Sequence, residues 1–235
     1  MRLAHVKSMV DRKVEGKKTR PSPINGEPTD KAQEISRLKS VGWWLMLLIC
    51  IAYAGFAFDM FRIELVSFLT NSPIEEARSR KTPVAFQLHA VLGGIGLICG
   101  ALQFNRTILR KYKYVHRGIG WVYLVAIWGA SLTGIYNSIY FDVPVSARGV
   151  FAVVGVWWFL TTSMAFWQIR KRDVQRHQGW MIRSFAISLF FVTFPVWVPS
   201  LQWFTPDAIA WPAGLFCAVV LNMTVGECWI NHAQR

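Results

Sequence analysis

Long apolar stretches alternate with short polar segments from residue 43 to residue 230 of the chain. Six of these stretches are long enough to cross a bilayer, because a hydrocarbon core about 30 Å thick needs roughly 20 apolar residues of helix. They are far longer than the ~10 alternating residues of a barrel strand, which favours helices. The pattern therefore predicts an all-α, polytopic membrane bundle with six transmembrane helices. The predicted spans are at about 43–61, 83–104, 117–137, 149–168, 181–202 and 211–230.

Residues 1–40 are polar, charged and rich in turn-forming residues. They have no repeating apolar face, so we expect a largely disordered, basic cytoplasmic tail. A short helix is predicted to begin near Asp30, because aspartate commonly caps the N-terminus of a helix. The expected organisation is this tail over 1–40 and one six-helix transmembrane domain over 41–235.

Lys and Arg are distributed unevenly between the two sides that this topology defines. Of the 26 basic residues, 21 lie before the first span, around the loops after the second and fourth spans, or at the end of the chain. Loops with an excess of Lys and Arg stay in the cytoplasm, so both termini are predicted to be cytoplasmic. The net charge of +13 thus indicates topology and contact with anionic membrane lipids, and nucleic acid is not an expected partner.

Histidine within or beside an apolar span is costly and therefore marks a candidate functional residue. In the second span, Gly93, Gly96 and Gly100 follow His89 on one helical face at about 100° per residue. Two interpretations of this face stay open. Gly96 and Gly100 form a GxxxG that permits close helix packing, inside the bundle or against a partner membrane protein. Alternatively, the glycines form a slot for a flat cofactor or a quinone.

Two further histidines lie at the predicted cytoplasmic ends of spans three and five. His116 begins a stripe that contains Gly120 and Tyr123, and His177 begins a stripe that contains Ser184. Because both histidines lie at the same depth, they are candidate metal ligands, as the two axial ligands of one haem b iron. Histidines in basic interfacial loops often contact only lipid phosphate, and this alternative stays open.

His89 lies some fourteen residues from the cytoplasmic end of its span, which is roughly 20 Å at 1.5 Å per residue. It therefore cannot share a metal ion with His116 and His177. Imidazole exchanges protons near neutral pH, so His89 suits proton or quinone handling instead. A zinc site is disfavoured, because two histidines have no suitably spaced carboxylate or cysteine beside them.

Arg183, Asn222 and Glu227 are the other polar candidates within the spans. Ionised groups at such depth are usually paired, so Glu227 is predicted to bind Arg183 or a histidine. A structural ion pair and a proton relay are both open for this carboxylate. The sequence contains no nucleotide-binding loop and no zinc-protease motif, so whether the protein is an enzyme stays open.

Three histidine-centred motifs together resemble a known family over roughly residues 83–230. They are His89-Ala90…Gly93, His116-Arg117…Gly120…Tyr123 and His177…Trp180-Met181…Arg183-Ser184. The chain resembles an uncharacterised family of predicted bacterial multi-span membrane proteins, catalogued as a domain of unknown function. This resemblance implies the bacterial inner membrane as the location and implies no settled activity. A weaker similarity to transmembrane b-type cytochromes of the b561 kind implies electron transfer.

The favoured function is transmembrane redox chemistry with a haem b or a quinone, together with a redox partner protein. The first alternative is a proton-coupled small-molecule transporter, in which His89 and Glu227 handle protons. In that case Pro195 marks a moving helix, because Pro195 and Pro199 are predicted to kink span five. The second alternative is an accessory membrane subunit without chemistry of its own.

Overall fold

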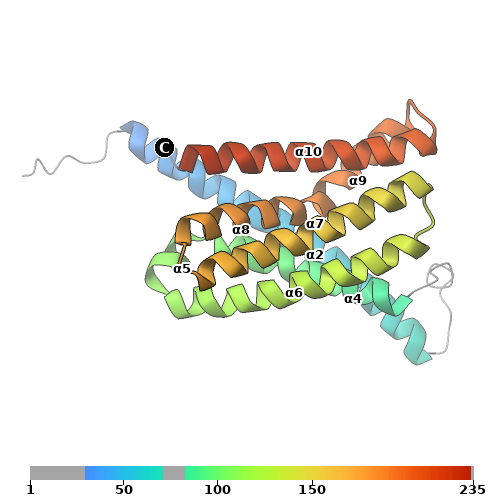
Figure 1. The fold of residues 1–235 in the computed structure, drawn as a ribbon, viewed down its shortest axis with the longest axis horizontal. Helices are drawn as coiled ribbons and strands as arrows, with labels where there is room; N and C mark the ends of the chain where they lie inside the picture. The colour runs from blue at the N-terminus through green and yellow to red at the C-terminus, as the bar shows by residue number, and fades with distance from the viewer. Residues whose placement is uncertain (1–29, 71–82, 234–235) are drawn as a thin grey trace, which may run out of the picture. The chain divides into compact units, whose positions relative to one another are not determined.

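The computed structural model describes residues 30–70 and 83–233, and all regular secondary structure in these residues is helical. The helices are, in chain order, α2 (Asp30–Thr70), α4 (Pro83–Gln103), α5 (Arg106–Lys111), α6 (Lys113–Tyr140), α7 (Val145–Arg170), α8 (Val174–Ser188), α9 (Phe190–Gln202) and α10 (Asp207–Ala233) (Figure 1). The absence of strands from the described residues agrees with the predicted all-α class.

Six helical segments of the described residues are long and apolar enough to cross a membrane, which confirms the predicted six-span architecture. They are Arg37–Ile63, Val84–Gln103, Lys113–Tyr140, Val145–Arg170, Val174–Gln202 and Asp207–His232. Most are longer than the predicted stretches, because the backbone stays helical into the polar flanks whereas the apolar pattern ends earlier. Which end of the bundle faces the cytoplasm stays a prediction.

The predicted disordered tail falls largely on residues 1–29, which lie outside the described part of the chain. Residues 30–40 are helical, and α2 begins at Asp30, where a helix start was expected. The chain divides into two compact units, Met1–Ser40 and Val41–Arg235. All contacts described below belong to the second unit.

Within this unit, α6 packs between α4 and α7, while α8 packs against α7 and α4. Helix α10 lies along α9 and also contacts α8 and α7 (Figure 1). The part of α2 from Val41 onward crosses this bundle diagonally in Figure 1 and meets α4 where Ala54 lies against Gly94. Glycine allows this close crossing, because a Cβ on Gly94 would make a tight contact, 3.3 Å from the Cα atom of Ala54.

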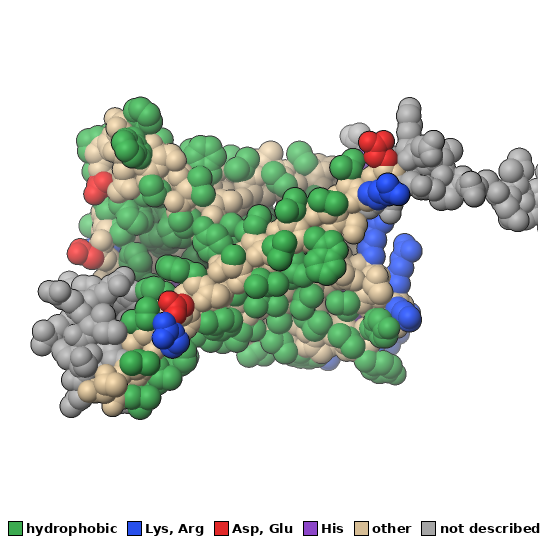
Figure 2. All heavy atoms as spheres, turned by 180° about the vertical axis from the view of Figure 1, so that it is seen from behind, with side chains coloured by type: hydrophobic (Ala, Val, Ile, Leu, Met, Phe, Trp, Pro, Cys, Tyr) green, Lys and Arg blue, Asp and Glu red, His purple; other side chains and the backbone are tan. Residues whose placement is uncertain are grey.

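Basic side chains gather at the end of the bundle where α4 passes into α6 and α7 passes into α8 (Figure 2). The short helix α5 lies in the first of these connections, and the Asn105 side chain caps it by accepting hydrogen bonds from the Thr107 and Ile108 amides. We call this the basic end. It is the end that the charge pattern places in the cytoplasm.

The fifth span is broken, but not at the prolines that predict a kink. Helix α8 ends at Ser188, α9 begins at Phe190, and Pro195 and Pro199 both lie inside α9. A proline ring collides with the carbonyl four residues earlier, which for Pro195 is Phe191, so the helix is distorted on the N-terminal side of the proline. The break at Leu189 lies six residues before Pro195. The fifth span is interrupted, as predicted, but the interruption lies closer to the centre of the span than the prolines do.

Candidate functional site

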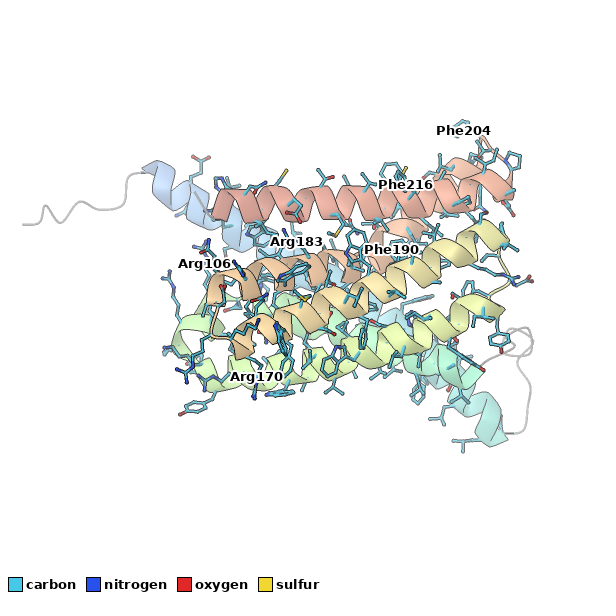
Figure 3. All side chains as sticks on the ribbon, in the orientation of Figure 1. Arg106, Arg170, Arg183, Phe190, Phe204 and Phe216 are labelled. Atoms are coloured by element: carbon cyan, nitrogen blue, oxygen red, sulfur yellow. The ribbon has the colours of Figure 1, made fainter. Side chains whose placement is uncertain are left out.

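An apolar cavity of about 250 Å³ lies between α2, α4, α6, α7 and α9, in the half of the bundle opposite the basic end. Aromatic side chains form much of its wall, and Figure 3 shows Phe190 pointing into the interior of the bundle. These side chains are Tyr53, Phe56, Phe86, Phe141, Phe151, Trp158, Phe190, Phe191 and Phe194. Their rings pack against one another, as between Phe151 and Phe190, whose centroids are 6.0 Å apart, so the wall is preformed.

His89 supplies one polar atom to this apolar wall. Its Nδ1 atom lies 2.8 Å from the carbonyl oxygen of Ala130 on α6. A carbonyl accepts only, so Nδ1 carries the proton, and in the neutral ring Nε2 keeps a lone pair. The Phe191 ring packs edge-on against the imidazole at 5.1 Å. His89 is thus fixed in orientation, and its Nε2 atom makes no hydrogen bond to a described residue.

Ser131 supplies the second polar atom. The residue is fully buried on the cavity wall, and its Oγ atom has no hydrogen-bond partner among the described residues. A buried hydroxyl without a partner costs about 1–3 kcal/mol, so such groups in native proteins call for an explanation. Because Ser131 follows Ala130, which binds His89, the two uncommitted polar atoms belong to neighbouring parts of the wall.

Of the three α4 glycines, Gly93 fits the interpretation as a ligand slot, and Gly96 and Gly100 fit the interpretation as close helix packing. A Cβ on Gly93 would meet nothing within 4 Å, so Gly93 borders open space in the cavity. A Cβ on Gly96 would collide with Ile127, and one on Gly100 would collide with Phe185. The slot therefore exists only at Gly93, and close packing explains the other two. The expectation that Gly96 and Gly100 dock another membrane protein is wrong, because α6 and α8 of the same chain fill that face.

The stripes below His116 and His177 face one another. The Tyr123 hydroxyl lies 2.8 Å from Ser184 Oγ and 3.3 Å from Ser188 Oγ. Tyr123 follows His116 by seven residues, and Ser184 follows His177 by seven residues. Both helices start at the basic end, so each histidine lies about 10 Å from this contact at 1.5 Å per residue. The two histidines are therefore at the same depth.

Each of these histidines keeps at least one nitrogen uncommitted. His177 Nδ1 donates to the carbonyl oxygen of Ala165 at 2.9 Å, which leaves Nε2 available. His116 Nδ1 is buried without a partner among the described residues, and the backbone oxygen of His116 accepts from Gln103 Nε2 at 2.9 Å. The described residues contain no group of three or more His, Cys, Asp or Glu that could hold a metal ion. A metal at this place would thus have two imidazole ligands at most.

The polar residues of the last span are held in protein contacts. Arg183 binds Glu227 with two parallel hydrogen bonds, of which Nη2–Oε2 is 2.8 Å, and its guanidinium lies 5.0 Å from the Trp180 ring centroid. This is one of the two predicted pairings of Glu227. Asn222 donates from Nδ2 to Thr193 Oγ1 at 3.0 Å. Figure 3 shows Arg183 at the side of α8 that faces α10, away from the cavity.

Sequence reasoning missed Ser131 and the contribution of α2 to the cavity. Ser131 lies beside the predicted stripe rather than on it, and a single serine in an apolar span carries no signal by itself. The α2 wall consists of Tyr53, Phe56, Ala57 and Met60, which are ordinary residues of a membrane span. Only the packing of α2 across the bundle places them beside His89.

Comparison with known protein families gives a match over most of the helical part of the chain. A family model with the description "Predicted membrane protein (DUF2306)" matches residues 86–230, a range that holds all three histidines of the two candidate sites. No curated protein and no solved structure matches the chain.

Proposed function

The chain belongs to the DUF2306 family of predicted membrane proteins, and we propose that this integral membrane protein binds a lipid-soluble quinone or quinol beside His89. One observation carries the proposal. His89 and Ser131 line a largely apolar cavity, and neither His89 Nε2 nor Ser131 Oγ makes a hydrogen bond to a described residue. Tyr53, Asn137 and Ser138 are the other polar residues that line it. Small-molecule sites commonly combine an apolar, aromatic wall with a few polar groups that orient the ligand.

The chemistry of these atoms favours a flat ring with oxygen substituents. Neutral His89 accepts a hydrogen bond at Nε2, which suits the hydroxyl of a quinol. Ser131 can donate to a carbonyl or accept from a hydroxyl, which suits either redox form of the ring. The aromatic wall offers the edges and faces against which such a ring packs. A water-soluble charged ligand would find no ionised side chain among the described residues of this wall.

The size of the cavity also limits the ligand. Its volume of about 250 Å³ lies just below the ~300–1,000 Å³ range of small-molecule sites, so a substituted six-membered ring is a better match than a macrocycle. Neutral His89, whose Nε2 atom makes no hydrogen bond to a described residue, is placed to accept a proton from one hydroxyl of a bound quinol.

Binding of a benzoquinone to the protein in lipid nanodiscs tests this proposal. Gly93→Leu places a side chain in the slot, where a Cβ meets no neighbour within 4 Å, and it should abolish binding. Gly118→Leu is the matched control, since Gly118 also faces open space but does not line the cavity. His89→Ala should weaken binding about tenfold or more, which corresponds to loss of one good polar contact. Unchanged binding in both Gly93→Leu and His89→Ala would refute the proposal.

A haem b held by His116 and His177 is the second candidate, and the buried, unpartnered Nδ1 atom of His116 favours it. The free Nε2 atom of His177 and the matched depth of the two rings fit the same role. Haem b, when bound, supplies one-electron transfer. Purified protein supplemented with haem should show a Soret band that His116→Ala and His177→Ala abolish and His89→Ala retains. A supplemented protein without this band excludes the haem.

The proton-coupled transporter is less well supported by the geometry. It requires Glu227 to exchange protons, and Glu227 is bound by Arg183 through two hydrogen bonds. We place the protein in the bacterial inner membrane with its basic end in the cytoplasm, as the distribution of Lys and Arg favours. In this orientation the cavity beside His89 lies in the outer half of the bilayer.

A further inference from the structure

Two residues of the cavity wall are exposed, and they come from two different helices. Phe56 on α2 lines the cavity and is 65% exposed, and Pro195 on α9 lines it and is exposed as well. An exposed residue in the wall of a cavity marks the place where the cavity opens. The mouth therefore lies between α2 and α9. In Figure 2, which shows the back of the molecule, the surface beside the diagonal helix is hollowed in the half away from the basic end.

The depth of the mouth determines what it opens to. Pro195 lies seven residues, or about 10 Å, before the end of α9 at Gln202, and His89 lies six residues, or about 9 Å, after the start of α4 at Pro83. These two helix ends are at the same side of the bundle, opposite the basic end. A bilayer core is about 30 Å thick, so the mouth faces hydrocarbon rather than water.

The attachment of α2 explains why the bundle is open here. Trp43 donates from Nε1 to the Ala101 carbonyl at 3.0 Å, and the Tyr53 hydroxyl donates to the Val192 carbonyl at 3.1 Å. Between Tyr53 and the end of α2, the described side-chain hydrogen bonds of this helix all lie within the helix itself. The part of α2 that follows Tyr53 thus borders the cavity without a described side-chain hydrogen bond to α9.

From this geometry we infer that the ligand carries a long hydrocarbon tail and enters from the membrane between α2 and α9. The inference rests on the proposed function and adds the class of ligand, a ring on a lipid tail. The ring lies against His89, and the tail passes Phe56 and Pro195 into the hydrocarbon. Lipid is as apolar as the mouth, so the tail gains little affinity from the protein. The mouth instead lets a ring reach the site while its tail stays in lipid.

The experiment compares two probes, 2,3-dimethoxy-5-methyl-benzoquinone and the same ring with a decyl tail, in phosphatidylcholine nanodiscs. Concentrations are expressed as mole fractions in the membrane, which removes the effect of partitioning. The wild type should bind both probes with affinities within about threefold, because the tail exchanges lipid for lipid-like surroundings. Met60 lines the cavity on α2, and Met60→Trp narrows the mouth.

Met60→Trp should weaken binding of the decyl probe at least about tenfold, because overpacking is costly. It should change the affinity for the tailless probe by less than about threefold. Phe61→Trp is the matched control, since Phe61 is the next residue, is 37% exposed and does not line the cavity; it should leave both probes unchanged. Equal weakening of both probes by Met60→Trp overturns the inference.

Failure of the inference can be told apart from failure of the proposed function. If neither probe binds the wild type, the proposed function itself fails. If the tailless probe binds and the decyl probe is excluded, only the inference fails. Should Met60→Trp not fold, a decyl probe with a diazirine at the tail end is used with the wild type. Its label should map to α2 and α9, and labelling confined to α6 or α10 overturns the inference.

Discussion

The Tyr123 hydroxyl lies 2.8 Å from Ser184 Oγ, and this contact joins α6 to α8 in the interior of the bundle. It belongs to a closed network, because Ser184 Oγ also lies 2.6 Å from Thr162 Oγ and Trp158 Nε1 donates to Ser188 Oγ at 3.0 Å. All of these residues are fully or almost fully buried. The network holds three helices in register between the cavity beside His89 and the two histidines at the basic end.

We expect Tyr123→Phe to lower the free energy of unfolding by about 1 kcal/mol, the typical net value of one hydrogen bond between membrane helices. The cost stays modest because Ser184 keeps Thr162 as a partner. Reversible unfolding in mixed micelles measures it. Tyr114→Phe, at a position that is 88% exposed, is the control and should leave the stability unchanged. A Tyr123→Phe variant as stable as the control contradicts this role.

The histidine stripes and the six spans could be predicted, because helical periodicity within one segment decides both. The predicted stripe of His116, Gly120 and Tyr123 does turn inward, and Tyr123 is buried and bonded to Ser184 of the predicted stripe of His177. Periodicity shows which face of a helix is small or polar. It does not show what the face meets, so the alternatives for Gly96 and Gly100 stayed open until the neighbouring helices were placed.

The cavity itself could not be predicted, because its wall comes from five helices that are distant in the sequence. Its mouth depends on α2, whose side chains Phe56 and Met60 have no distinctive pattern. The break at Leu189 likewise depends on packing, since the prolines fix only that the helix is distorted and not where it bends. These features follow from contacts between spans, and a single sequence carries information mainly on contacts within them.

Gly100 is closely packed whereas Gly93 borders open space, so adding a methyl group at the two positions should have different effects on stability. Gly100→Ala should lower the free energy of unfolding by about 1–3 kcal/mol, because the new Cβ collides with the buried Phe185 ring. Gly93→Ala should be neutral or stabilise by up to about 1 kcal/mol, since alanine favours helix and meets no neighbour. The same unfolding assay measures both, and equal effects would contradict this difference in packing.

The ion pair between Arg183 and Glu227 should contribute measurably to stability, although its side chains are 27% and 41% exposed. A double-mutant cycle with Arg183→Ala and Glu227→Ala should give a coupling of about 0.5–1 kcal/mol, the upper range for partly exposed pairs. Arg176 and Asp173 form the comparison pair, with side chains 73% and 36% exposed. Their coupling should be about 0.3 kcal/mol or less. A coupling larger than that between Arg183 and Glu227 would contradict the prediction that the Arg183–Glu227 pair contributes more to stability.

The closest test of the His89 orientation uses Gly134, one turn beyond Ala130 on α6. A Cβ on Gly134 would lie 2.9 Å from both Cε1 and Nδ1 of the imidazole, so Gly134→Ala must displace the ring and weaken its bond to the Ala130 carbonyl. Benzoquinone binding should then fall about tenfold although His89 is present, because the acceptor atom no longer points at the ligand.

The matched control for this prediction is Gly129→Ala. Its Cβ would also meet a side chain of α4, the flexible end of Leu92, but neither residue lines the cavity. The two variants should therefore differ in benzoquinone affinity and not in folding, and NMR of ring-labelled histidine should show the His89 signals shifted only in Gly134→Ala. If Gly134→Ala binds the quinone as tightly as Gly129→Ala, a fixed His89 is not required and the ligand is held by the apolar wall alone.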